Sequence, residues 1–155
     1  MRRALFPTAT VVWLLSLVAL ASSTVQRAQG AEEMKIQAIL VWGTDESKPP
    51  EGKNYKPLDE QITKRLRALK WKNYFEVKRI EFTAATGAPK KIAVSDKCEL
   101  EVQGLGNSKI EVVLYGKGKE AARVKGVLPK NEILVPGSGD APNENAWLVV
   151  LKRLD

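Results

Sequence analysis

The chain has 155 residues, of which 25 are Lys or Arg and 18 are Asp or Glu, with one cysteine and no histidine. The lack of histidine removes every Ser-His or Cys-His dyad and the usual zinc ligand, and one cysteine forms neither an internal disulfide nor a thiolate cluster. We therefore expect no cofactor and no metal, and a hydrolase would have to use paired carboxylates or a Ser-Lys arrangement.

The first thirty residues have the layout of a secretory signal peptide. Two arginines precede an apolar stretch at residues 9–21 that is too short to cross a bilayer as a helix, and cleavage is expected after Ala21 or after Gly30. Cleavage after Gly30 removes three arginines and no acid, so the count of basic residues falls from 25 to 22 and the net charge from +7 to +4. We expect a periplasmic or secreted protein with a single domain over residues 31–155, no transmembrane segment in the mature chain and no nucleic-acid partner.

The segments that begin and end this expected domain are apolar on both of their alternating faces. Residues 34–43 have the sequence MKIQAILVWG, and residues 147–154 have the sequence WLVVLKRL. A strand that is apolar on both sides is usually central in a sheet and covered on both faces. Both segments are therefore expected to be central strands, in neighbouring positions.

An amphipathic helix is expected after the proline-rich connection at residues 44–57. Pro57 suits its first turn, and the helix is expected to end near Leu69 or Lys70, with Asn73 as the left-handed residue that terminates it. Four apolar residues recur at the spacing of one helix face: Leu58, Ile62, Leu66 and Leu69.

From Phe75 onward the pattern is that of antiparallel strands. The apolar phase changes within residues 75–82, which requires a bulge near residues 78–79, whereas residues 92–102 keep one phase. Turns rich in glycine and lysine then join three strands into a meander. The sequence predicts an α+β, mostly β fold: an antiparallel sheet or β-sandwich-like domain of about seven or eight strands with one covering amphipathic helix.

The stretch KRLRALKWKNYFEVKR at residues 64–79 has seven basic residues, three aromatic residues and one acid. One interpretation is the solvated face of a helix, followed by aromatic rings that turn back to cover the sheet. The alternative is a binding surface for an anionic envelope polysaccharide or a lipid headgroup, in which cations lie beside partly exposed rings. The candidate ligand-binding residues are Lys64, Arg67, Lys70, Trp71, Lys72, Tyr74, Lys78 and Arg79.

Other polar groups allow two interpretations each. Glu99 and Glu101 share a strand face and Glu111 lies on the next strand, so they form either a solvated face or a carboxylate pair for acid-base chemistry. Cys98 is expected to be a small buried apolar residue, with a reactive thiol as the alternative. Residues 136–146 gather oxygen donors together with Gly and Pro, a composition that fits either a turn or a binding loop.

The stretch LRALKWKNYFEVKR and the ending NAWLVVLKRL resemble a group of small exported bacterial proteins with no assigned activity. The resemblance covers residues 34–154, rests on no catalytic motif and implies no site. We therefore expect a non-enzymatic binding or structural module of the bacterial envelope or exterior, whose partner is an anionic envelope polymer or another envelope protein. Two alternatives remain: an anion-binding protein that uses residues 64–79, and a hydrolase that works through carboxylates.

Overall fold

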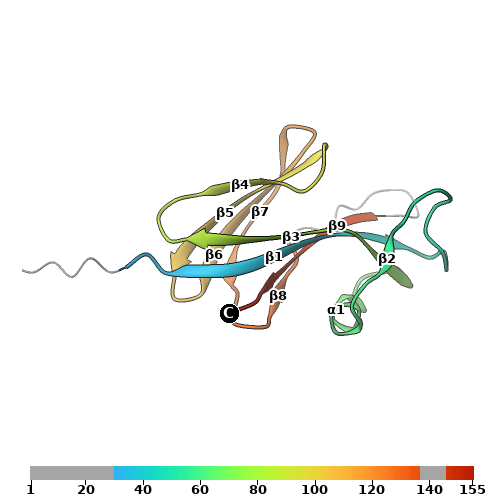
Figure 1. Ribbon diagram of the computed structural model, residues 1–155, viewed down its shortest axis with the longest axis horizontal. Helices are drawn as coiled ribbons and strands as arrows, with labels where there is room; N and C mark the ends of the chain where they lie inside the picture. Colours follow the sequence, from blue (N-terminus) through green and yellow to red (C-terminus); the bar gives the residue numbers. More distant parts are fainter. Residues whose placement is uncertain (1–29, 137–145) are drawn as a thin grey trace, which may run out of the picture.

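The computed structural model describes residues 30–136 and 146–155, which hold two antiparallel sheets and one helix (Figure 1). The five-stranded sheet has the order β2 (Lys56–Pro57), β3 (Asn73–Ala85), β1 (Glu33–Thr44), β9 (Ala146–Arg153) and β8 (Ile133–Leu134). The four-stranded sheet has the order β4 (Lys90–Ala93), β5 (Cys98–Gly106), β6 (Lys109–Gly116) and β7 (Lys119–Val127). The predicted mostly β, sandwich-like fold is confirmed, whereas the expected signal peptide lies outside the described residues except for Gly30.

The five-stranded sheet is the middle layer of the molecule, with the four-stranded sheet and helix α1 (Glu60–Leu66) on its opposite faces (Figure 1). Strands β1 and β9 pair with each other at its centre, which confirms their predicted central and neighbouring positions. Even-numbered residues of β1 pack against the four-stranded sheet, and Ile39 and Val41 pack against the helix. Burial on both sides accounts for the doubly apolar sequence, because each face is removed from water.

The helix begins later and ends earlier than predicted. The carboxylate of Asp59 accepts hydrogen bonds from the backbone amides of Gln61 and Ile62, which caps the N-terminus. The helix ends at Leu66 instead of near Leu69 or Lys70, because the Leu66 carbonyl accepts hydrogen bonds from the Leu69 amide (2.9 Å) and the Tyr74 hydroxyl (2.9 Å).

Two local predictions around this helix are wrong. Asn73 is the first residue of β3 and is absent from the residues with positive φ, so it does not end the helix. Pro57 belongs to the short edge strand β2, where the missing amide is tolerated, instead of the first helical turn. The chain turns early because the Trp71 ring must lie over Gly43, where a Cβ atom would come within 3.1 Å of the ring.

Each sheet contains a β-bulge. In β3, Leu40 pairs with Lys78 and Val41 pairs with Glu76, so Val77 is the extra residue. This confirms the bulge inferred from the change of apolar phase, one residue before the predicted position. In β7 the register also shifts, because Leu114 pairs with Ala122 and Tyr115 with Glu120, which leaves Ala121 as the extra residue.

The predicted meander is formed by β5, β6 and β7. Its two turns have positive φ at both central residues: Asn107 (52°) and Ser108 (60°) in the first, Lys117 (51°) and Gly118 (75°) in the second. Such turns match the right-handed twist of the strands that they join. Within the described ranges, no helix has the length and apolar character needed to cross a membrane.

Candidate ligand-binding cleft

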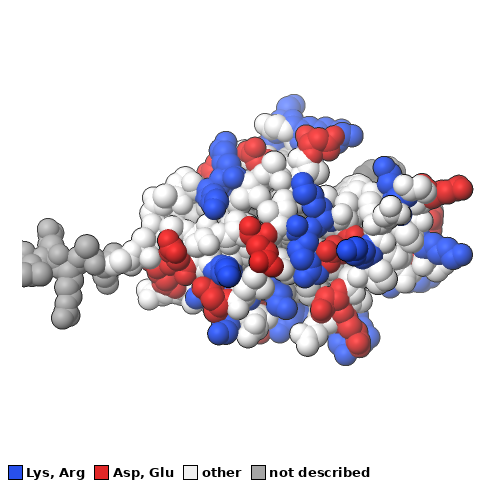
Figure 2. Space-filling model, viewed as in Figure 1, with Lys and Arg blue, Asp and Glu red and all other residues white. Residues whose placement is uncertain are grey.

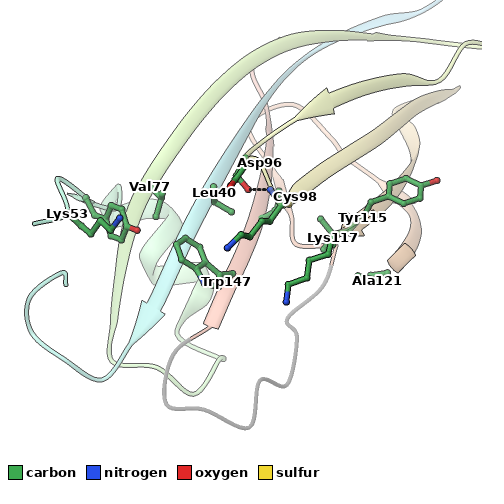
Figure 3. Close-up of a pocket in the computed structure, with 16 residues that line it drawn as sticks. Leu40, Lys53, Val77, Asp96, Cys98, Tyr115, Lys117, Ala121 and Trp147 are labelled. Carbon is green, nitrogen blue, oxygen red and sulfur yellow. Dashed lines mark hydrogen bonds between the residues drawn. The ribbon is translucent and has the colours of Figure 1, made fainter. Parts of the chain in front are cut away.

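Strands β5, β6 and β7 diverge from β1 and β3 at one end of the sandwich (Figure 1). A cleft of about 900 Å³ opens between the two sheets there (Figure 3). Its lining comes from both sheets, from the connection before β2 and from the turn before β5. Apolar small-molecule sites typically have volumes of roughly 300–1,000 Å³. The cleft therefore has the size of a ligand site. The sequence analysis did not predict it.

The wall from the five-stranded sheet is a row of apolar side chains. Leu40 and Val149 are partners in the central ladder, and the bulged Val77 lies beside them on β3. Leu40 and Val149 are buried and belong to the core between the sheets, and Val77 packs against that core. The floor of the cleft is thus a continuation of the hydrophobic core, left open at one end.

The wall from the four-stranded sheet is made largely of small residues. Cys98 pairs with Gly116 in the ladder, and the bulged Ala121 and its neighbour Ala122 lie on the adjoining strand. Small side chains leave space that a Leu or Phe would have filled. Each wall also carries a β-bulge at the cleft, at Val77 and at Ala121, and β-bulges bend strands and are common beside binding sites.

Tyr55 and Trp147 line the cleft and belong to a cluster of aromatic rings with the buried Trp42 and Phe75. Trp42 pairs with Phe75 and Trp147 across three strands, and the ring centroids of Trp42 and Phe75 lie 5.9 Å apart. The ring of Tyr55 lies edge-on to both Trp42 (6.0 Å) and Trp147 (6.3 Å). Trp147 is 54 % exposed, so one face of the cleft presents a large apolar ring to solvent. Exposed tryptophans of this kind are a frequent feature of binding surfaces.

Lysines line the mouth of this apolar cleft. Lys53, Lys97 and Lys117 contribute to its lining, together with one acid, Asp96. The Lys117 amide donates a hydrogen bond to the Lys97 carbonyl (2.9 Å), which brings two turns together at the mouth. Lys117 also adopts a φ of 51°, a conformation that Gly or Asn usually supplies in such turns. A lysine at this turn position is therefore unusual on conformational grounds.

Cys98 lies on the cleft wall and packs against the core between the sheets. Its contacts fit the expectation of a small apolar residue, but Cys98 is only partly buried. Burial raises the pKa of the Cys98 thiol above its ordinary value. A raised pKa lowers the thiolate fraction at neutral pH, which disfavours the alternative of a reactive nucleophile.

The structure does not gather the candidate residues of the 64–79 stretch into one surface. The rings of Trp71 and Tyr74 are buried, with 7 % and 6 % of each residue exposed, and both belong to the core beneath the helix. The Lys70 ammonium lies 5.3 Å from the centroid of the Trp71 ring. Burial of the rings fits the first interpretation, in which they turn back to cover the sheet.

The remaining cations of that stretch are spread out. Lys64 forms an ion pair with Glu60 (2.8 Å), and Arg79 pairs with Glu76 and donates a hydrogen bond to Gln37 (2.8 Å). Figure 2 shows acidic side chains among the basic ones over the face in view, without a broad patch of one sign. The other basic candidates are exposed: Arg67, Lys72 and Lys78.

The three candidate carboxylates form ion pairs with cations of the four-stranded sheet. The Lys91 ammonium lies 3.6 Å from Glu99 and 3.9 Å from Glu101, and Glu111 pairs with Arg123 (2.7 Å) and Lys125 (3.3 Å). Hydrogen bonds from Arg123 and then Lys125 hold the pKa of Glu111 below its ordinary value. A general acid needs the opposite shift, so this arrangement fits a charged, solvated face.

No cluster of three His, Cys, Asp or Glu residues able to hold a metal ion occurs within residues 30–136 and 146–155. The proposed binding loop at residues 136–146 lies outside the described residues except at its two ends. Comparisons of the chain with protein-family models, with curated proteins and with solved structures give no match. Inferences about function therefore rest on the geometry of the cleft.

Proposed function

We propose that the protein is an exported, non-enzymatic binding module of the bacterial envelope or exterior, and that it binds an apolar ligand in the cleft between its sheets. The observation that carries this proposal is the apolar cleft of about 900 Å³, continuous with the core and open to solvent beside Trp147. Neither the sequence nor the described residues supply a recognisable catalytic set, which favours binding over turnover.

The physical driving force for such a ligand is the removal of apolar surface from water. Leu40, Val77 and Val149 line the floor of the cleft, and Trp147 lies at its opening. Burial of apolar surface yields about 25 cal/mol per Å², so a ligand that covers these side chains gains affinity without directional contacts. The sheets themselves are held by the closed part of the core, so the cleft can be largely preformed in the free protein.

The two alternatives from the sequence have less support. A surface at residues 64–79 would need exposed aromatic rings, yet Trp71 and Tyr74 are buried. A carboxylate hydrolase would need an acid with a raised pKa, yet cations lower the pKa of Glu111. The cleft is therefore the binding site that the structure supports best.

The test is binding of a neutral apolar fluorophore, N-phenyl-1-naphthylamine, to the purified protein. Ala122 lines the cleft, so Ala122→Leu should fill part of it and weaken binding by about tenfold or more. Ala93→Leu is the matched control, because Ala93 is an exposed alanine of the same sheet outside the cleft lining. Absence of binding by the folded wild type, or equal loss in both variants, would overturn the proposal.

Export has its own test. Mass measurement of the protein recovered from the periplasm or medium of a bacterial host should give a chain that starts at Ser22 or Ala31, depending on the cleavage site. A chain that remains in the cytoplasm with residues 1–30 intact would contradict export and leave the cleft proposal untouched.

A further inference from the structure

We infer that the ligand of the cleft is a single-chain amphiphile with an anionic head group, whose apolar chain lies between the sheets and whose head group binds Lys97 and Lys117. This inference rests on the proposed function and adds the chemical class of the ligand. It follows from three observations: the positions of the lysines, the lack of an ion pair between them and any carboxylate that the structure describes, and the polarity of the walls.

The lysines are positioned together by the backbone. The hydrogen bond between the Lys117 amide and the Lys97 carbonyl (2.9 Å) joins the β6–β7 turn to the turn before β5. Figure 3 shows the Lys117 amine at the mouth of the cleft, on the side where Trp147 also lies. Lys53 adds a third cation from the connection before β2.

These lysines differ from three cations on the outer face of the four-stranded sheet. Lys91, Arg123 and Lys125 form ion pairs with glutamates on the outer face of the four-stranded sheet. Among the residues that the structure describes, no carboxylate forms an ion pair with the three lysines of the mouth. Asp96 lies at the same mouth, so the described lining carries three positive charges against one negative charge.

The deep part and the rim of the cleft differ in polarity. Its floor carries apolar side chains, including Leu40, Val77 and Leu114, whereas the charged residues lie on turns and connections at its rim. An ionised group in the floor would lose its hydration without a partner, so it would be strongly disfavoured there. An anion at the rim keeps contact with water and gains attraction to the lysines. A ligand with one anionic end and one apolar chain satisfies both parts of the cleft.

The experiment compares three ligands with the same ten-carbon chain as competitors of N-phenyl-1-naphthylamine: decanoate, 1-decanol and decyltrimethylammonium. Decanol is the more apolar molecule, so it should bind better than decanoate if only the chain matters. We expect instead that decanoate displaces the fluorophore at a concentration about tenfold lower than decanol, and that the cation is the weakest. High salt should reduce the advantage of decanoate.

The variant Lys97→Gln/Lys117→Gln should lose the preference for decanoate over decanol, measured as the ratio of the concentrations at which the two displace the fluorophore. Lys109→Gln/Lys130→Gln is the matched control, since it removes the same charge from exposed lysines outside the cleft lining. Fluorophore binding with no preference for decanoate, or a preference that survives Lys97→Gln/Lys117→Gln, would overturn this inference and leave the proposed function standing. Failure of the wild type to bind the fluorophore would overturn both.

Discussion

At one end of the sandwich the two sheets close on each other, and at the other end they separate. The closed end buries Met34, Ile110 and Leu128 completely, whereas Leu114 and Cys98 at the open end are only partly buried. Both ends belong to the same ladders and use the same alternation of apolar residues. Alternation thus determines which side chains face inward, whereas their size determines whether the space between the sheets is filled.

Hydrogen bonds hold the closed end together, and those to the Glu32 carboxylate run from one sheet to the β5–β6 turn of the other. The Glu32 carboxylate accepts hydrogen bonds from the amides of Asn107 (2.7 Å) and Ser108 (3.2 Å), and the Glu32 carbonyl accepts one from the Thr86 amide (3.0 Å). The Leu128 amide donates to the Ser108 carbonyl (2.7 Å). The open end has small residues on one wall, and its partly buried side chains, such as Val77, Cys98 and Leu114, pack against the edge of the core between the sheets.

The largest expected difference between the two ends comes from a pair of leucines that are partners in one ladder. Leu100 is fully buried and Leu114 lines the cleft. Leu100→Ala should lower the free energy of unfolding by about 2–5 kcal/mol, since it leaves a cavity in close-packed surroundings. Leu114→Ala should cost clearly less, because it only widens an existing cleft. Urea unfolding of both variants gives the comparison, and equal losses would mean that the cleft is packed as tightly as the core.

A smaller difference is expected for two glycines. A Cβ atom on Gly104 would lie 3.0 Å from backbone atoms of Ala85 and Thr86, whereas the nearest neighbour of a Cβ on Gly116 is 3.9 Å away. Gly104→Ala should therefore lower the free energy of unfolding by about 1–3 kcal/mol, because backbone atoms cannot move aside easily. Gly116→Ala should have little effect, and a thermal-unfolding comparison in which Gly116→Ala is the worse variant would contradict the described geometry.

The smallest effect concerns the ion pairs on the outer face of the four-stranded sheet. Hydrogen bonds from Arg123, with Lys125 also acting on Glu111, hold the pKa values of Glu111 and Glu120 below the ordinary value of 4.5. A carboxyl with a lower pKa in the folded state stabilises the fold above that ordinary value, and this contribution is lost as the pH falls through the folded pKa.

The corresponding measurement is the urea midpoint of wild type and Glu111→Gln at neutral pH and at about pH 3. The variant should be slightly less stable at neutral pH, because it weakens charge-assisted hydrogen bonds with exposed partners. The difference should shrink as the pH falls, because the wild-type carboxyl takes up a proton and its hydrogen bonds lose the charge assistance. A difference that grows in acid would mean that the carboxylate does not stabilise the fold.

The sequence predicted the parts of this molecule that depend on local pattern. The doubly apolar strands, the meander and the bulge follow from the periodicity of apolar residues, and so does the presence of one amphipathic helix. The end of the helix was misplaced because the hydroxyl of Tyr74 and the close approach of Trp71 to Gly43 are tertiary contacts. No local pattern contains them.

Sequence analysis did not predict the cleft, for the same reason. Ala121 and Ala122 looked like ordinary strand residues, and Lys117 like part of a hairpin turn, which it is. Their role depends on meeting the turn at Lys97 and the strand at Trp147, which are distant in the chain. Two weak signals were present: consecutive alanines in an otherwise charged strand, and a lysine where the turn favours Asn or Gly.

Cys98 is the one cysteine of the chain and lies on the cleft wall. Its alkylation therefore reports directly on whether a ligand occupies the cleft. The rate of alkylation of Cys98 by N-ethylmaleimide should be slow in the free protein, since burial raises the pKa of the thiol. Saturation with N-phenyl-1-naphthylamine should slow it further, over the same concentration range as the rise in fluorescence. If the fluorophore binds while the alkylation rate stays unchanged, the ligand lies elsewhere, which would contradict binding in the cleft.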